Sequence, residues 1–217
     1  MNYLVNKHID VKKYDYFISI GDKCPTAETL KYLGLRKVSF PFDYIPSKPS
    51  LILKYLINGL NDFFPDPQTS NEQFAYNKDG IYFEHFDFSE DEYSNTVDMF
   101  TKRYKRLNEI FKQKKETILF VYTEEGSIYN NLNKQYDNNY NDILEIRNYL
   151  INNFNYTNFD ILVISNNKIY NDEMNIINFN INIDEEYFSN DLSTHNIVYP
   201  IYRPLLVEMM KKIFLIE

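Results

Sequence analysis

The chain has few of the residues on which several classes of protein depend. Its 217 residues include one cysteine, three histidines, five glycines and no tryptophan. A single cysteine forms no disulfide within the chain and cannot build a multi-cysteine metal site. The histidines, His8, His85 and His195, are too far apart in sequence for a local zinc motif. Disulfide-stapled scaffolds and cysteine-based metal modules are therefore excluded.

Basic residues and long apolar runs are scarce as well. The 23 Lys and Arg stand against 31 Asp and Glu, which gives a formal charge of −8. Proteins that bind nucleic-acid phosphates usually present a basic face, and only the segment 102–107, KRYKRL, approaches one. Charges of alternating sign surround it, so we interpret it as solvated helix surface and expect no nucleic-acid partner. No apolar run approaches the ~20 residues that cross a bilayer, and no signal-peptide pattern is present, so we expect a soluble cytoplasmic protein without a membrane partner.

The chain does contain a regular alternation of short apolar runs and amphipathic segments. Continuous apolar runs, typical of strands buried on both faces, occur at 16–20, 117–123 and 159–165. Helical spacing of apolar residues predicts helices over 25–33, 49–60, 95–114, 142–154 and about 204–214. Residues 176–183 alternate strictly, which predicts an edge strand with one wet face. Strands separated by helices imply a single α/β domain, 1–217, with a mostly parallel central sheet and helices on both faces.

Three shorter segments complete the predicted outline. Residues 74–88 have the pattern of a β-hairpin, with Asn77–Gly80 as its turn. Residues 37–45 form an extended segment that Pro41 interrupts. Ser47 is placed to cap the helix that follows it.

The one cysteine directly follows the first strand, in the sequence Gly21-Asp22-Lys23-Cys24-Pro25. Glycine permits a tight turn off the strand, and Pro25 suits the first helical position because its missing N–H would have no partner there. Cys24 then caps a helix, where unpaired amides and the adjacent Lys23 lower the pKa of a thiol. Ligands of parallel α/β folds bind beyond the carboxyl ends of the strands, so Cys24 is a candidate nucleophile. A small residue packed at a crowded turn is the alternative.

A thiolate nucleophile works with a histidine, and a carboxylate or amide holds the histidine ring. His85 lies in the segment FEHFD, where alternation would put Phe83, His85 and Asp87 on one face. An exposed hairpin histidine is the alternative, and His195, in NDLSTHN, is the competing base. Asp43, in SFPFDYI, either orients a group in the site or caps a turn.

Residues 16–45 also carry a resemblance to a known family. They contain an apolar strand, Gly21, Cys24, a helix that ends in Gly34-Leu35-Arg36, and the segment Ser39-Phe40-Pro41-Phe42-Asp43. This succession resembles the opening of the putative papain-like cysteine peptidase family, which is found in bacteria and large DNA viruses. The resemblance extends more loosely to about residue 125, through NDFF (61–64), a histidine near a hairpin and an arginine-bearing helix.

The resemblance implies that Cys24 is the nucleophile and His85 the favoured base, with Asp43 as an orienting or substrate-contacting acid. The implied activity is that of a cysteine-dependent hydrolase, a peptidase or amidase that needs no metal or organic cofactor. Its substrate would be of the peptide, acyl or glycan type, and in a viral protein the compartment would be the host cytoplasm. The candidate binding residues are Gly21, Asp22, Lys23, Asp87 and Arg103. A papain-like plan packs the cysteine's helix on an antiparallel barrel-like sheet, whereas the alternation here predicts a parallel one.

Other functions fit parts of the sequence. An esterase of the Gly-Asp-Ser-Leu type has its nucleophile after the first strand and an Asp–His pair near the C-terminus, which IGDKC and DLSTH (191–195) imitate. The serine is absent, however, and Asp191 and His195 are four residues apart rather than three. A glycosyltransferase-like protein would bind a nucleotide sugar through the first strand's glycine and the cations of Lys23, Arg103 or Arg106, but no Gly-rich phosphate loop is present. A non-catalytic interaction protein is the remaining alternative.

Overall fold

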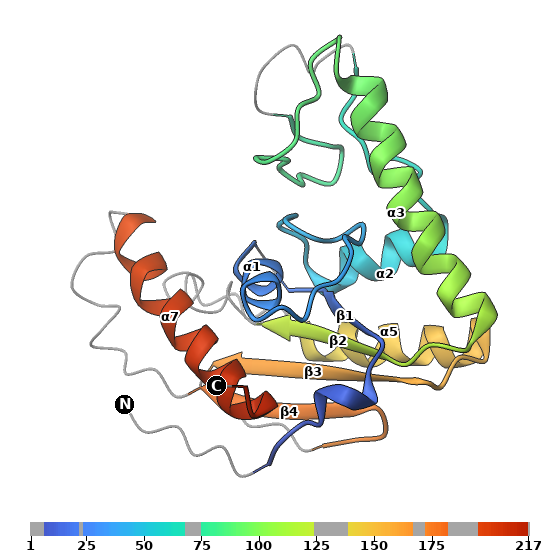
Figure 1. Cartoon of the computed structure of the whole chain (residues 1–217). Helices are drawn as coiled ribbons and strands as arrows, with labels where there is room; N and C mark the ends of the chain where they lie inside the picture. Colours follow the sequence, from blue (N-terminus) through green and yellow to red (C-terminus); the bar gives the residue numbers. More distant parts are fainter. Residues whose placement is uncertain are drawn as a thin grey trace.

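The computed structural model describes residues 7–21, 24–67, 75–123, 139–166, 172–181 and 195–216, without the side chains of 166, 181 and 195–203. Its strands are β1 (Tyr16–Ser19), β2 (Ile118–Thr123), β3 (Phe159–Asn166) and β4 (Ile176–Ile181). They form one sheet in the order β1-β2-β3-β4, in which every neighbouring pair is parallel (Figure 1). The predicted parallel sheet is confirmed, and β4 lies at its edge as expected.

The described helices follow the predicted ones closely. They are α1 (Cys24–Tyr32), α2 (Pro49–Asn58), α3 (Tyr93–Gln113), α5 (Asn139–Phe154) and α7 (His195–Phe214), with a 3-10 turn η1 (Val11–Lys13) before β1. Lys114 caps the C-terminus of α3, and its left-handed φ of 58° lets its N–H donate to Ile110 O. The main difference is α7, which begins well before the predicted residue 204. None of the helices described here is long and apolar enough to cross a membrane.

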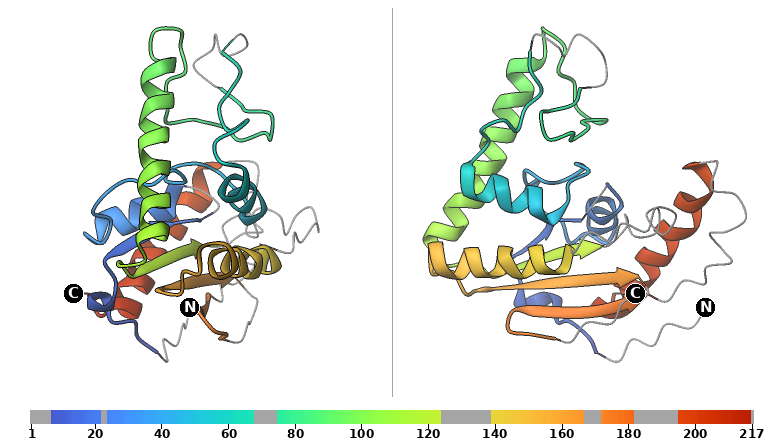
Figure 2. Two further views of the ribbon diagram at one scale, coloured as in Figure 1. Left: turned by 90° about the vertical axis from the view of Figure 1, so that its right-hand side faces the viewer. Right: turned by 180° about the vertical axis from the view of Figure 1, so that it is seen from behind.

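The alternation of side chains along the strands divides the core into two layers. Ile18, Phe120 and Ile161 face α2, α3 and α5, whereas Phe17 and Leu162 face α7 and part of α1. The helices therefore cover both faces of the sheet, as Figure 2 shows from two further directions. Apolar burial on both sides explains why the strand sequences are continuous apolar runs.

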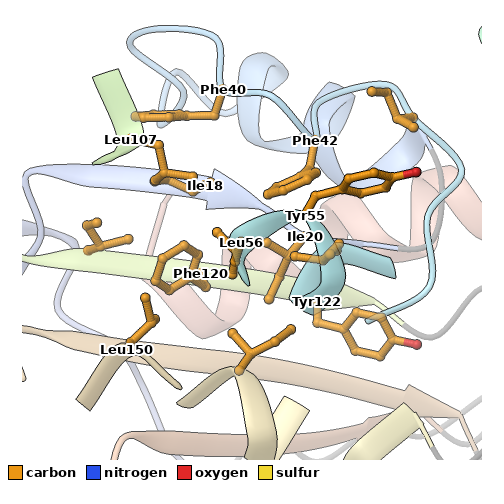
Figure 3. Close-up of a cluster of buried hydrophobic side chains, with 14 of the residues drawn as sticks. Ile18, Ile20, Phe40, Phe42, Tyr55, Leu56, Leu107, Phe120, Tyr122 and Leu150 are labelled. Carbon is orange, nitrogen blue, oxygen red and sulfur yellow. The ribbon is translucent and has the colours of Figure 1, made fainter. Parts of the chain in front are cut away.

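The loop between α1 and α2 is held down by two phenylalanines. Phe40 and Phe42 are 1% and 2% exposed and point into the core beside Ile18 and Tyr55 (Figure 3). The predicted extended segment is interrupted here by a turn over 41–44. The prediction that Ser47 caps α2 is wrong, because Lys48 occupies the N-cap position without a side-chain bond and Pro49 opens the helix.

The predicted hairpin forms over residues 75–83. Asn77 N–H donates to Ile81 O at 3.1 Å, and Phe83 N–H donates to Ala75 O at 3.0 Å. The hairpin is tied to α2 by Asp79, whose carboxylate accepts from Lys54 Nζ at 2.6 Å and from the Tyr55 hydroxyl. In Figure 1 the long helix α3 extends beyond the sheet, and the segment 75–92 lies beside its upper part. The position of the segment 75–92 places His85 next to Cys24, beyond the carboxyl end of β1.

Candidate functional site

Cys24 lies where the chain passes from β1 into α1. It is the first residue of α1 and Pro25 is the second, and the candidate binding residues Asp22 and Lys23 lie outside the described residues. A Cβ added at Gly21 would lie 2.8 Å from Thr26 Cβ and 3.1 Å from Thr123 Oγ1. Glycine is therefore needed here because α1 and the end of β2 approach the backbone closely.

The structure brings Cys24 and His85 together. The distance from Cys24 Sγ to His85 Nε2 is 3.1 Å, although the residues are 61 positions apart. Cys24 is half-buried and His85 is exposed, so the pair is accessible from solvent. The separation lies within the ~2.6–3.2 Å over which a base takes a proton from a nucleophile.

Tyr44 lies against the His85 ring. The two ring centroids are 5.9 Å apart at an interplanar angle of 79°, an edge-to-face arrangement that fixes ring orientation. Tyr44 has a left-handed φ of 63°, which costs about 1–2 kcal/mol for a residue with a side chain. Arg36 holds it there, since its Nη2 donates to the Tyr44 hydroxyl at 3.2 Å and its guanidinium carbon lies 4.9 Å from the ring centroid. Burial raises the pKa of Tyr44, and Arg36 opposes that change.

Asp43 is fully buried behind this pair of residues. Its carboxylate accepts from Arg36 Nη1 at 2.8 Å and from Phe40 N–H at 3.0 Å. Burial raises the pKa of Asp43, while the Phe40 amide and Arg36 act in the opposite direction. The hydrogen bonds described for the Asp43 carboxylate are with Arg36 and Phe40, so it is linked to His85 through Arg36 and Tyr44.

Asp87, the other candidate for orienting the base, bonds elsewhere. Its Oδ1 accepts from Ser89 N–H at 2.8 Å, which holds the pKa of the carboxyl below its usual range. The alternation that would have placed it beside His85 is broken by a turn, in which Phe86 N–H donates to Phe83 O at 3.2 Å. Phe83 and Phe86 both pack on Phe100 of α3, so burial of their rings overrides the strand pattern.

Arg103 and Arg106 occupy the layer behind the site. The Arg103 guanidinium lies 5.6 Å from the Phe86 ring centroid and 5.3 Å from that of Phe100. Its Nη1 is buried and has no hydrogen-bond partner among the described residues, and burial lowers the pKa of the group. Arg106 Nη1 donates to Ser39 O at 2.6 Å. Both cations thus contact the protein's own interior, in contrast to the phosphate-binding role that a nucleotide-sugar site would give them. The interpretation of 102–107 as solvated helix surface is therefore wrong for these two residues, which are partly buried.

Arg36 and Tyr44 are the site residues that sequence reasoning missed. Both stand in the segment that carries the family resemblance, next to residues that were singled out, and their proximity in sequence was the available signal. His195 is the first residue of α7, but its side chain and Asp191 lie outside the described residues, so the esterase pair stays a prediction. Within the described ranges, no group of three His, Cys, Asp or Glu could hold a metal ion.

Comparison with known proteins adds to this geometry. The model of the family described as putative papain-like cysteine peptidase matches residues 15–78, which confirms the resemblance over this part of the chain. The matched stretch contains Cys24, Arg36, Asp43 and Tyr44 and ends before His85. No curated protein and no solved structure gives a match. The match supports a cysteine hydrolase in coarse terms, and the cysteine here stands on a parallel α/β sheet.

Proposed function

We propose that the protein is a cysteine-dependent hydrolase or acyl transferase in which Cys24 is the nucleophile and His85 is the general base. The observation that supports this most directly is the 3.1 Å separation of Cys24 Sγ and His85 Nε2. The first turn of α1 supports it further, because its partial positive charge favours a thiolate over a thiol.

In the proposed reaction His85 takes the proton from Cys24, and the thiolate attacks the carbonyl carbon of an amide or ester. The new C–S bond forms, the bond from carbon to the leaving nitrogen or oxygen breaks, and His85 returns the proton to the leaving group. Water, or another acceptor, then attacks the thioester with His85 as base and releases Cys24. No redox partner is required.

The negative charge on the carbonyl oxygen needs hydrogen-bond donors in the transition state. Pro25 has no N–H, so in the proposed site the donors at this end of α1 are the amides of Cys24 and Thr26. The hydrogen bond between the hydroxyls of Thr26 and Thr123 fixes the first turn of the helix against β2. The donors would therefore be held in place before the substrate arrives.

Asp43 has a positioning role in this proposal. Its buried carboxylate anchors Arg36, Arg36 holds Tyr44 in its left-handed conformation, and Tyr44 packs edge-on against His85. This arrangement fulfils the requirement for a group that orients the base through ring contact instead of a hydrogen bond.

Alkylation of the thiol tests the proposal directly, because the chain has one cysteine. The rate of iodoacetamide modification would be followed by intact mass from pH 5 to 10, with Cys24→Ser as the blank. We expect the rate profile of the native protein to have its midpoint well below the ~8.5 of an ordinary thiol. In His85→Ala the midpoint should move back toward that value.

The matched control is His8→Ala, since His8 is an exposed histidine whose Nδ1 lies 3.0 Å from Lys212 O, away from the site. Its profile should coincide with that of the native protein. A thiol that reacts only after unfolding in urea, or a profile that His85→Ala leaves unchanged, would show that Cys24 is a packing residue and overturn the proposal.

A further inference from the structure

A pocket of about 480 Å³ lies between α1, the turn at 41–44 and α7. Its described lining consists of Glu28, Thr29, Lys31, Tyr32, Tyr44 and Val207. This volume is within the ~300–1,000 Å³ that small-molecule sites occupy. The pocket is therefore large enough for a complete aromatic or aliphatic side group.

Two residues connect this pocket to the Cys24–His85 pair. Tyr44 lines the pocket and also packs its ring against His85. Glu28 lines the pocket one helical turn after Cys24, so the two side chains are on the same side of α1. A substrate whose carbonyl lies at the Cys24 sulfur thus has the pocket directly beside it.

The composition of the lining indicates what the pocket would accept. Tyr32, Tyr44 and Val207 supply the apolar surface, and Tyr32 is 73% exposed. Glu28 and Lys31 carry opposite charges, so neither sign is favoured overall. We infer that the pocket binds an uncharged apolar group, aromatic or branched aliphatic, next to the carbonyl that Cys24 attacks. This inference rests on the proposed function and adds a substrate class to it.

The experiment compares two alkylating reagents on the full chain, iodoacetamide and its N-benzyl derivative, which differ by one aromatic group. Burying such a group contributes about 1.5–3 kcal/mol, and 1.4 kcal/mol corresponds to a tenfold change. We therefore expect the native protein to prefer the benzyl reagent by about tenfold or more, relative to the ratio of the two rates for a free thiol. Val207→Trp, which fills the pocket from α7, should abolish that preference.

The matched control is Glu208→Trp, because the neighbouring Glu208 is exposed and lines a separate hollow near the end of α7. It should retain the full benzyl preference. Tyr32→Ala is the second variant, since truncating a side chain that is 73% exposed leaves the core intact, and it should lower the preference by several-fold.

The outcomes separate the two proposals. Two results would overturn the inference about the pocket and leave the hydrolase proposal standing. One is a fast, His85-dependent reaction with iodoacetamide without a preference for the benzyl reagent. The other is a benzyl preference that neither Val207→Trp nor Tyr32→Ala reduces. Slow reaction with both reagents, at the rate of an ordinary thiol, would overturn both.

Discussion

Replacing Gly21 with alanine tests the structural basis of the site without any assumption about the reaction. The added Cβ would lie 2.8 Å from Thr26 Cβ and 3.1 Å from Thr123 Oγ1, and still closer to Thr26 Oγ1. Thr26 belongs to the first turn of α1 and Thr123 ends β2, so neither can move without displacing its element. The variant must therefore separate α1 from the sheet.

The cost follows from two contributions. Overpacking a close-packed site costs about 1–3 kcal/mol, and losing the buried hydrogen bond between Thr26 and Thr123 adds roughly 1 kcal/mol. We expect Gly21→Ala to lower the free energy of unfolding by about 2–4 kcal/mol in urea titrations. Because the displaced turn carries Cys24, the alkylation rate at neutral pH should also fall.

Gly34→Ala is the matched control for this variant. Gly34 has a φ of 70°, but a Cβ there meets nothing within 4 Å, so the substitution adds only backbone strain of about 1–2 kcal/mol. Equal losses of stability in the two variants would refute the close-approach reasoning. An unchanged alkylation rate in a destabilised Gly21→Ala protein would show that the first turn of α1 does not position the thiol.

Two further predictions concern buried or half-buried carboxylates. Hydrogen bonds from Lys54 and Tyr55 hold the pKa of Asp79 below its usual range, so this carboxylate stabilises the fold above the unfolded pKa of ~3.9 and loses its contribution as pH falls through the lowered value. The urea concentration at the midpoint of unfolding should therefore fall more steeply between about pH 5 and 3 in the native protein than in Asp79→Asn. Parallel plots of this midpoint against pH for the two proteins would contradict the prediction. Asp43→Asn leaves the Arg36 side chain, 10% exposed, without its counter-charge and should cost about 3–5 kcal/mol in the same titration. A loss below about 1 kcal/mol, typical of exposed pairs, would show that the pair is not buried in solution.

The sheet was predictable because each of its strands is specified by a local pattern. Burial on both faces requires continuous apolar residues in β1, β2 and β3, and these runs are visible in the sequence without any tertiary information. The hairpin turn was predictable for a similar reason, since Gly80 has a φ of 76° and glycine adopts that region easily. In β4 the alternation was only partly informative, because Asn178, expected on the wet face, is 7% exposed.

Of the candidate site, the sequence predicts the position of Cys24 but not the arrangement of the residues around it. The position of Cys24 after a buried strand is a local feature of the sequence. The approach of His85 to Cys24, in contrast, depends on how the segment 75–92 packs along α3. Strand alternation placed Asp87 beside His85, and the packing of Phe83 and Phe86 on α3 instead makes a turn there. The contact of Tyr44 with His85 depends on a left-handed φ at a non-glycine residue, which no local pattern predicts.

The order of the strands has a consequence for how the site comes into being. Neighbouring β3 and β4 pair at Ile161 and Ile176, close in sequence, whereas α1, α2 and α3 all intervene between β1 and its partner β2. Closing the 61-residue loop from Cys24 to His85 costs an entropy worth about 3.6 kcal/mol. Contacts between residues this far apart in sequence slow folding, because the entropy of loop closure must be spent before the contact can stabilise the chain. In the proposed mechanism, the Cys24 thiol therefore gains its base, His85, only once this loop has closed.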